Sequence, residues 1–313
     1  MRGSLVTRFK KRKDVGMDIF CVVVPTRNRH ELLKGLLENL AANHDHWKIW
    51  LIIVDSSDVP IQVNAHNFFD LTIIKSNVKS AAYQRNIGLD LIFSKSRRNI
   101  EVISFLDDDV RVEPDYFELT RAAFAEDSDA IGFSGLAISQ HTNFSYKRPT
   151  FLEKRFKRSQ GKINRLGINV PITESLHNKI KVDWLIGCSS WRFSNLSETR
   201  FQSDFKGQSL FEDVIFSYGL SKRGSLYVLP QLRIVHLLTP IERPNIFQHS
   251  FSWTINRHRL FILYPCDFRL RYYWAGNFMK LLYDTFRGLI LLDSDHFRSA
   301  LGVVKGSIKV LRS

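Results

Sequence analysis

From residue 19 to about residue 136, short apolar runs rich in β-branched side chains alternate with stretches of helical periodicity. This alternation is typical of a parallel sheet flanked by helices, because the chain returns across the sheet before each new strand begins. It predicts an α/β fold with a Rossmann-like, mostly parallel central sheet. Asn28 and Glu31 have the spacing of a capping box for the first helix. Strands are expected at 19–24, 50–54, 71–74 and 102–106.

Three adjacent carboxylates, Asp107, Asp108 and Asp109, follow the apolar run that ends at Leu106. Folding alone does not require such a cluster at the end of a strand. Carboxylate oxygens are hard ligands suited to Mg²⁺ or Mn²⁺, and a divalent ion can carry the phosphates of a nucleotide. A helix cap, a turn or a solvated acidic patch is the alternative reading of the triplet taken alone.

Polar groups follow three of the predicted strands. Thr26 and Arg27 follow the first strand, Asp55 follows the second, and the acidic triplet follows the fourth. Ligands of doubly wound sheets bind at the carboxyl ends of the strands. We therefore expect Asp55, Asp107 and Asp109 to surround one shared cavity.

Composition limits the partners and the compartment. The chain has 313 residues, of which 44% are hydrophobic, and this suits one large domain or one domain with an appendage. A formal charge of +14 favours an anionic partner, such as a nucleotide, a nucleic acid, an acidic polymer or a phospholipid surface. Cys21, Cys188 and Cys266 are widely spaced, so neither a disulfide framework nor a zinc site is indicated, and a reducing compartment fits best.

The rest of the chain carries weaker signals. No segment approaches the roughly 18 to 20 uninterrupted apolar residues of a membrane-spanning helix. Residues 1–18 form a basic tail. A second basic cluster lies between residues 145 and 165. Strand character returns at 182–190, and 211–220 is predicted as a helix. From residue 253 the chain is aromatic, basic and helix-prone, which suits either core packing or contact with an anionic bilayer near a lipid-linked acceptor.

Four motifs occur in one order along the first 135 residues or so. They are Val-Val-Val-Pro-Thr-Arg-Asn-Arg at 22–29, Ile-Val-Asp-Ser-Ser at 53–57, Ala-Ala-Tyr-Gln-Arg-Asn-Ile-Gly at 81–88 and Phe-Leu-Asp-Asp-Asp-Val at 105–110. With these motifs the chain resembles the family 2 glycosyltransferases of the GT-A fold, in the nucleotide-diphospho-sugar transferase superfamily. The resemblance implies a GT-A catalytic domain at 19–245, with a nucleotide-binding half at 19–136, an acceptor-side half at 137–245 and a helical C-terminal extension at 246–313.

The resemblance also implies roles on the donor side. Thr26 and Asp55 would hold the base and ribose, and Arg85 would lie near the diphosphate. Asp107 and Asp109 would form the Asp-x-Asp motif, with Asp109 in direct contact with the metal and Asp107 shared between ribose and metal. Turn capping by Thr26, loop capping by Asp55 and a solvated Arg85 are the structural alternatives. The donor-binding candidates are Pro25, Thr26, Arg27, Arg29, Asp55, Arg85, Asp107 and Asp108.

On the acceptor side the match is weaker. Residues 184–190 look like the strand that precedes an acidic pair in the family, and Glu212 and Asp213 fit that pair. Asp213 would be the general base, with Glu212 holding the acceptor or taking the base role. Helix-dipole compensation is the alternative for both carboxylates. His236 follows an apolar run, and it would be a third metal ligand beside Asp107 and Asp109, a phosphate contact, or a buried structural histidine.

The resulting hypothesis is a metal-dependent glycosyltransferase of the hexosyltransferase type that uses Mn²⁺ or Mg²⁺. It would move one sugar, with inversion, from a nucleotide-diphosphate donor, with a UDP-sugar favoured, to a glycan or lipid-linked acceptor in surface glycan or polysaccharide biosynthesis. The Gln-x-x-Arg-Trp motif of processive synthases is missing from the chain, which favours transfer of a single sugar. The expected location is the cytoplasm, with peripheral association at the inner face of the cell membrane as an option.

Two other functions compete with this hypothesis. A sugar nucleotidyltransferase would also use a carboxylate-bound metal, but such enzymes usually begin with a Gly-rich loop and residues 25–28 contain no glycine. A non-enzymatic basic protein that binds nucleic acid or an anionic surface would account for the charge. No nucleic-acid motif accompanies the charge, so a nucleic-acid partner is not expected.

Overall fold

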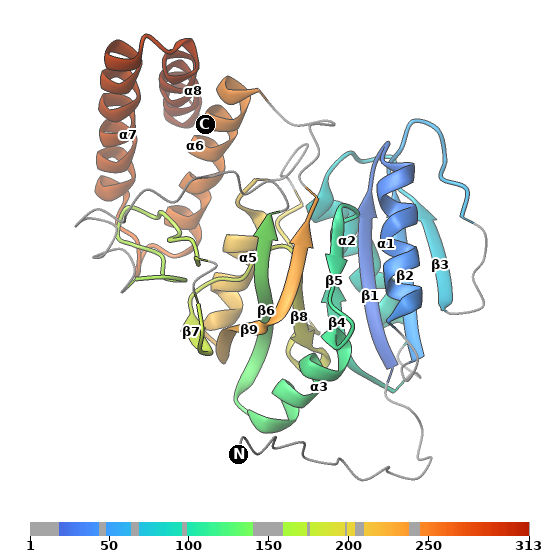
Figure 1. Ribbon diagram of the computed structural model, residues 1–313. Coiled ribbons are helices and arrows are strands. Elements are labelled where there is room, and N and C mark those ends of the chain that lie inside the picture. Colours follow the sequence, from blue (N-terminus) through green and yellow to red (C-terminus); the bar gives the residue numbers. More distant parts are fainter. Residues whose placement is uncertain are drawn as a thin grey trace, which may run out of the picture.

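The computed structural model (Figure 1) describes residues 19–43, 48–63, 69–95, 99–139, 159–173, 176–197, 199–203, 210–237 and 245–312. The predicted basic tail and most of the basic cluster between residues 145 and 165 lie outside these ranges.

A mixed, mostly parallel sheet forms the centre of the molecule. The order of its described strands is β3-β2-β1-β4-β8-β6-β9-β5, with β7 also paired to β9. Strands β3, β2, β1 and β4 are mutually parallel, β6 is parallel to β9, and β8 is inserted antiparallel between β4 and β6. This arrangement confirms the predicted fold class. The strands are β1 (Ile19–Thr26), β2 (Lys48–Asp55), β3 (Asp70–Lys75), β4 (Ile100–Phe105), β5 (Val110–Val112), β6 (Ala130–Ser139), β7 (Ile180–Val182), β8 (Ser189–Arg192) and β9 (Ser225–His236).

Helices cover both faces of the sheet, and two local predictions are wrong. The strand expected at 182–190 is divided into β7 and β8, because Leu185 N–H donates to Ser217 Oγ at 3.0 Å instead of to a neighbouring strand. Asn28 does not cap the first helix. Arg29 is the N-cap, while Asn28 adopts a φ of 53° and its side chain bonds Asp58. The helices are α1 (His30–Ala42), α2 (Ala81–Ser94), α3 (Tyr116–Glu126), η1 (Phe193–Asn195), α5 (Glu212–Ser221), α6 (Ile246–Leu263), α7 (Leu270–Leu291) and α8 (Ser294–Leu311).

Strand β1 shows how the core is divided between the two faces of the sheet. Phe20 and Val22 pack into a cluster with residues of α1 and α3, whereas Cys21 and Val23 pack into a second cluster with residues of α2 and α5. A Cβ on Gly88 would lie only 2.5 Å from Val23 Cγ1, so α2 approaches the sheet at a point where only glycine fits. Burial on both faces explains why the parallel strands read as continuous apolar runs.

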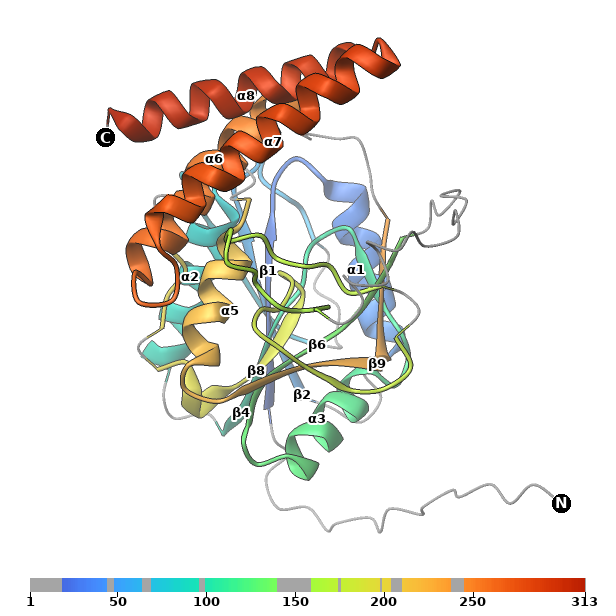
Figure 2. The same cartoon turned by 90° about the vertical axis from the view of Figure 1, so that its left-hand side faces the viewer.

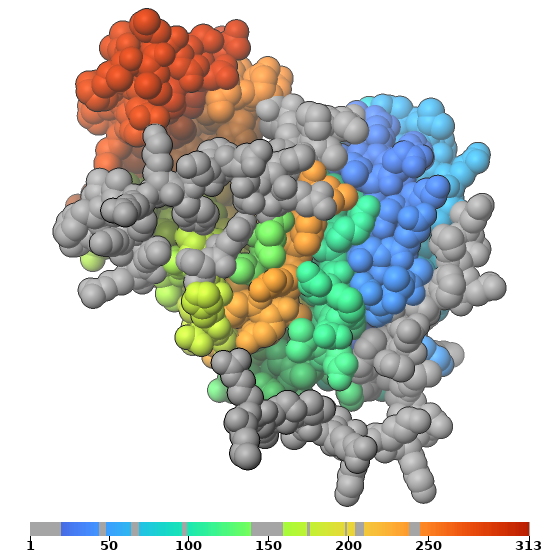
Figure 3. Space-filling model, in the orientation of Figure 1, coloured from blue at the N-terminus to red at the C-terminus, as the bar shows by residue number. Residues whose placement is uncertain are grey.

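The C-terminal helices form a separate layer. Helix α6 packs against α8, and α7 and α8 form an outer hairpin at the end of the molecule toward which the parallel strands point (Figures 1 and 2). In the space-filling view this hairpin projects from the body (Figure 3). The expected division of the chain at residue 245 remains a prediction. In the part of the chain described by the structure, no helix has both the length and the apolar character required to cross a bilayer.

Candidate active site

A cavity of about 1170 Å³ opens at the carboxyl edge of the sheet. Pockets for small ligands typically have about 300–1,000 Å³, so this one is at least as large as a typical ligand site. Its walls come from the loops after β1 and β4, the end of β9, and the first turns of α2, α5 and α6. Among its lining residues are the predicted Pro25, Thr26, Arg27, Arg29, Arg85, Asp107, Asp108, Asp109, Glu212, Asp213 and His236.

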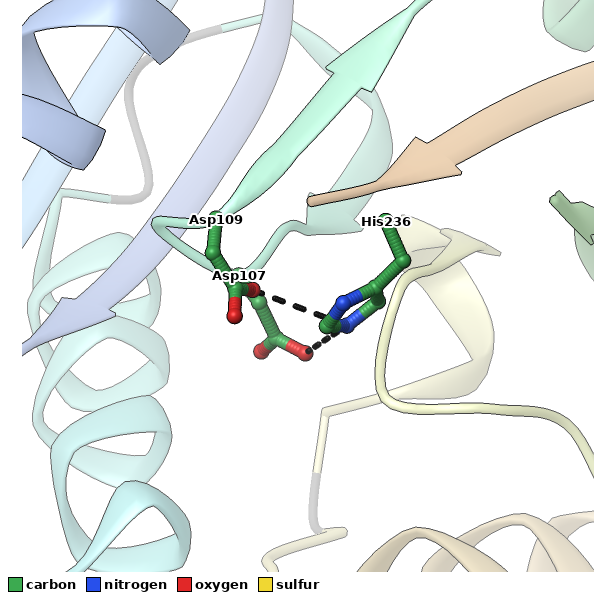
Figure 4. A group of neighbouring side chains, drawn as sticks. All are labelled: Asp107, Asp109 and His236. Atoms are coloured by element: carbon green, nitrogen blue, oxygen red, sulfur yellow. Dashed lines mark ion pairs between the residues drawn. The ribbon is translucent and has the colours of Figure 1, made fainter. Parts of the chain in front are cut away.

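Asp107, Asp109 and His236 converge at this cavity (Figure 4). His236 Nε2 lies 3.5 Å from Asp109 Oδ1 and 3.9 Å from Asp107 Oδ2, and one ligand atom from each residue lies within 4.8 Å of the others. The backbone holds this arrangement, because Val110 is paired with His236 between β5 and β9 and Leu237 N–H donates to Asp109 O at 2.9 Å. The structure thus brings these three side chains together, and their role as metal ligands remains a prediction.

The electrostatics of this cluster suit a divalent cation. Burial raises the pKa of Asp109, and the neighbouring carboxylate of Asp107 adds to this rise, which outweighs the opposing effect of His236. Burial would also raise the pKa of Asp107, but Arg85 and His236 lower it below its ordinary value. Carboxylates are ligands that Mn²⁺ and Mg²⁺ accept, and a bound cation would relieve the repulsion between Asp107 and Asp109. The donor set thus fits the metal that the sequence suggested.

The central carboxylate of the triplet has different contacts. Asp108 accepts a hydrogen bond from Thr26 Oγ1 at 2.7 Å and one from Arg29 Nη1 at 3.0 Å. Burial raises the pKa of Asp108 to about 6, although Arg29 opposes the rise. Asp108 therefore ties the end of β1 to the acidic loop. Direct donor contacts by Thr26, Arg29 and Asp108 remain predictions.

Asp55 lies at the same sheet edge, beside Thr26 in the pairing of β1 with β2, but it does not line the cavity. Its carboxylate accepts the backbone N–H groups of Ser57 at 2.7 Å and Ile61 at 3.1 Å, and Lys75 Nζ lies 3.6 Å away. The expected convergence of the carboxylates thus holds for Asp107 and Asp109 but not for Asp55, because the loop after β2 supplies nearer donors.

Arg85 connects the two sides of the cavity. Only 3% of this side chain is exposed; its Nη2 lies 2.7 Å from Asp107 Oδ1, and its Nη1 pairs with Glu212 Oε1. The guanidinium thus contacts carboxylates of both the acidic loop and α5. Contact with a diphosphate, the role implied by the family resemblance, remains a prediction.

The first turn of α5 presents the acidic pair. Phe211 precedes it with a φ of 77°, a left-handed conformation that is strained for a bulky residue. Glu212 is buried against Arg85. Asp213 is half-buried in the cavity wall, and its Oδ1 accepts a hydrogen bond from Val214 N–H at 2.8 Å. Burial raises the pKa of Asp213 to about 6. A carboxylate that titrates near neutral pH suits general base catalysis.

Sequence reasoning missed the wall formed by α6. Gln248, His249 and Ser252 line the cavity from the first turns of this helix. They belong to no motif, and they reach the site only because α6 packs over the carboxyl edge of the sheet. The strained backbone at Phe211 also left no trace in the sequence, since its immediate neighbours are Leu210 and Glu212.

Known proteins resemble this chain in sequence. The family model described as glycosyl transferase family 2 matches residues 21–180. The rhamnosyltransferase WbbL of Escherichia coli (strain K12) is 26% identical over 244 residues, covering 74% of this chain and 88% of WbbL.

Solved structures resemble the chain in fold. The mannosyltransferase PcManGT of Pyrobaculum calidifontis, in complex with GDP-Man and Mn²⁺, has a TM-score of 0.55 at 14% identity, covering 96% of this chain and 91% of PcManGT. The S. aureus TarS fragment 1-349, in complex with UDP-GlcNAc, has a TM-score of 0.51 at 14% identity, covering 78% of this chain. This chain spans 66% of that fragment, just under two thirds.

These likenesses agree with the fold and with the four motifs. At such low identity the structural matches establish the fold alone, and that fold is GT-A, as the sequence predicted. The family model spans more than half of the 313 residues and includes all four motifs. The chain therefore belongs to glycosyl transferase family 2.

Proposed function

We propose that this glycosyltransferase moves a single sugar from a nucleotide-diphosphate donor to an acceptor hydroxyl, with inversion at the anomeric carbon, and that it requires Mn²⁺ or Mg²⁺. The observation that carries this proposal is the presence, in one cavity, of the Asp107–Asp109–His236 cluster and of Asp213. Family membership argues against both a nucleotidyltransferase and a non-enzymatic basic protein.

The donor side of the mechanism rests on the acidic loop. Asp107, Asp109 and His236 would hold the cation, which when bound neutralises negative charge on the departing diphosphate. Arg85 keeps Asp107 ionised and oriented through its 2.7 Å contact, and Asp108 fixes the loop through Thr26.

The acceptor side rests on Asp213. In its ionised form this carboxylate accepts the proton of the acceptor hydroxyl while the oxygen attacks the anomeric carbon and the bond to the diphosphate breaks. A pKa of about 6 leaves most Asp213 side chains ionised at neutral pH. Glu212 pairs with Arg85, so it is the weaker candidate for the base. One base on the acceptor side suits a direct displacement, which inverts the anomeric configuration.

The donor sugar is the least defined part of the proposal. We infer a hexosyl or deoxyhexosyl donor, because the curated relative is a rhamnosyltransferase and the two structural neighbours bind GDP-Man and UDP-GlcNAc. The preference for a UDP-sugar stays a prediction. So do a glycan or lipid-linked acceptor, a place in surface glycan or polysaccharide biosynthesis, and a cytoplasmic location.

The test is a panel of UDP-, GDP- and rhamnosyl-nucleotide donors in a thermal unfolding assay, with Mn²⁺ and with a chelator. At least one donor should raise Tm only when Mn²⁺ is present, and the product formed from it should have the opposite anomeric configuration by NMR. Equal stabilisation by a donor with and without metal, or no stabilisation by any donor, would overturn the metal-dependent mechanism.

A further inference from the structure

Helix α7 has its polar and apolar faces reversed relative to an ordinary surface helix. Its buried residues are Tyr273, Gly276, Asn277, Asp284 and Gly288, so after Tyr273 the packing face has only small or polar side chains. Its outward face carries large apolar side chains, and a surface helix in water normally has the opposite arrangement. The exposed side chains are Phe278 (60%), Met279 (57%), Leu282 (54%), Phe286 (63%), Leu289 (61%) and Ile290 (59%).

Helix α8 continues the same pattern beside α7. Its packing face is built from small residues, which include Ser299, Gly302 and Gly306, and these let the helix approach α6 closely. A Cβ on Gly302 would lie 2.5 Å from Phe247 O. Its exposed apolar row is Phe297, Leu301, Val304, Ile308 and Leu311. We refer to this row together with the six α7 side chains as the outer apolar face.

Polar groups fill the contact between the two helices. Asp284 accepts hydrogen bonds from Ser299 Oγ at 2.6 Å and Lys280 Nζ at 2.9 Å, and Ser299 Oγ lies 2.7 Å from Ser250 Oγ on α6. Burying satisfied polar groups inside while exposing two rows of large apolar side chains would weaken folding in water alone. An exposed patch of this kind marks an interaction surface.

A row of cations accompanies the outer apolar face along α8. Arg298, Lys305, Lys309 and Arg312 each follow an apolar residue of the face by one position, so they form a parallel row about 100° around the helix. Arg298 pairs with Asp295, and the other three cations add net positive charge. An apolar face bordered by Lys and Arg is typical of a helix that lies in the interface of an anionic bilayer. An isologous contact with a second copy of the chain is the alternative occupant of the same face.

We propose that α7 and α8 lie flat on an anionic phospholipid bilayer, with the outer apolar face at the boundary between headgroups and acyl chains and with Lys305, Lys309 and Arg312 among the headgroups. The hairpin lies at the same end of the molecule as the carboxyl ends of the parallel strands (Figures 1 and 2). Docking would thus hold the catalytic cavity close to the bilayer surface.

Helix α6 supplies the physical connection between hairpin and cavity. Gln248 and His249 line the cavity, while the neighbouring Ser250 bonds Ser299 of α8. If the proposed function holds, the surface favours an acceptor anchored in the same bilayer; this last step rests on the proposed function, whereas the docking itself does not.

The test is co-flotation of the full chain with vesicles of phosphatidylcholine and phosphatidylglycerol, compared with vesicles of phosphatidylcholine alone. The wild type should float with the anionic vesicles and lose binding in high salt. We expect the α7 double variant Leu282→Gln/Phe286→Gln and the α8 double variant Lys305→Glu/Lys309→Glu each to bind at least about tenfold more weakly.

There are two matched controls. Val59→Gln changes an apolar side chain that is 69% exposed and distant in sequence from α7 and α8, and Lys34→Glu reverses the charge of an exposed side chain on α1. Both should bind like the wild type, and all variants should keep the wild-type Tm because the changed side chains are exposed. Equal binding by the α7 double variant and the wild type would overturn the proposal. The proposal would also be overturned if the wild type does not float and instead sediments without lipid as a dimer that the Leu282→Gln/Phe286→Gln variant does not form.

Flotation requires neither donor nor acceptor, so its outcome is independent of catalysis. A wild type that binds its donor in the presence of Mn²⁺ but does not float with anionic vesicles would overturn the membrane surface alone. A wild type that floats but binds no donor would overturn the proposed function alone.

Discussion

Arg85 on α2 and Glu212 on α5 form a buried ion pair that joins these two helices across the cavity. The same guanidinium holds Asp107 at 2.7 Å. Because the side chains of Arg85 and Glu212 are only 3% and 6% exposed, this pair is shielded from solvent and its loss would leave two carboxylates without their cation.

Replacing Arg85 with Met should therefore destabilise the fold strongly. Breaking a buried pair by removing one partner typically costs about 3–5 kcal/mol in the free energy of unfolding. Urea denaturation measures this loss. The matched control is Arg200→Met, which breaks a pair with the exposed Asp90 at 2.8 Å and should cost less than about 1 kcal/mol. Similar losses in the two variants would contradict the structural role of Arg85.

The metal cluster can be tested by Mn²⁺ binding itself. Asp109→Asn and His236→Ala each remove one proposed ligand, so the Mn²⁺ affinity measured by calorimetry should fall at least about tenfold. Asp90→Asn removes an exposed carboxylate elsewhere and should leave the affinity unchanged. Wild-type Mn²⁺ affinity in both ligand variants would mean that the cation binds at another place.

Asp213→Asn separates chemistry from donor binding. The amide cannot accept the proton of the acceptor hydroxyl, so kcat should fall by about 10²–10⁴, the usual contribution of a positioned general base. The Kd of the donor should change less than about twofold. Retention of wild-type kcat would remove Asp213 as the base and direct attention to Glu212.

The raised pKa of Asp213 fixes a pH dependence. Only the ionised carboxylate acts as a base, and burial places its pKa at about 6 instead of 3.8. In the wild type, kcat/KM should be flat above about pH 7 and fall about tenfold per pH unit below 6. The profile of residual Asp213→Asn activity should lack this acidic limb. A limb that persists in the variant would belong to another group.

Asp55 offers a test between loop capping and donor contact. Its two backbone hydrogen bonds indicate a structural task, and although burial raises its pKa, the bonds from Ser57 lower it below the ordinary value. Asp55→Asn should lower the free energy of unfolding by about 1–3 kcal/mol. Donor affinity at a temperature where the variant is folded should stay within about threefold. A large loss of affinity with unchanged stability would instead support direct contact with the base or ribose.

Much of the site was predictable because topology limits where strand ends can lie. The carboxyl ends of parallel strands share one sheet edge. Apolar runs that end near Thr26 and at the Asp107–Asp109 triplet therefore predicted one shared cavity. The acidic pair at Glu212 and Asp213 followed from the family resemblance.

Which contacts each of these groups makes depends on the tertiary structure. Neighbouring loop residues point in different directions, so no sequence pattern could place Asp108 against Thr26 while placing Asp107 and Asp109 beside His236. The same holds for Asp55, whose nearest donors are backbone N–H groups of its own loop. Local periodicity in the sequence was enough to predict the first four strands, because a buried parallel strand reads as a short apolar run, but it did not predict β5 or β6. Hydrogen bonds between residues far apart in the chain depend on tertiary packing. So does the choice of which face of α7 is buried, because the apolar side chains of a helix recur every 3.6 residues whether they face the core or the solvent.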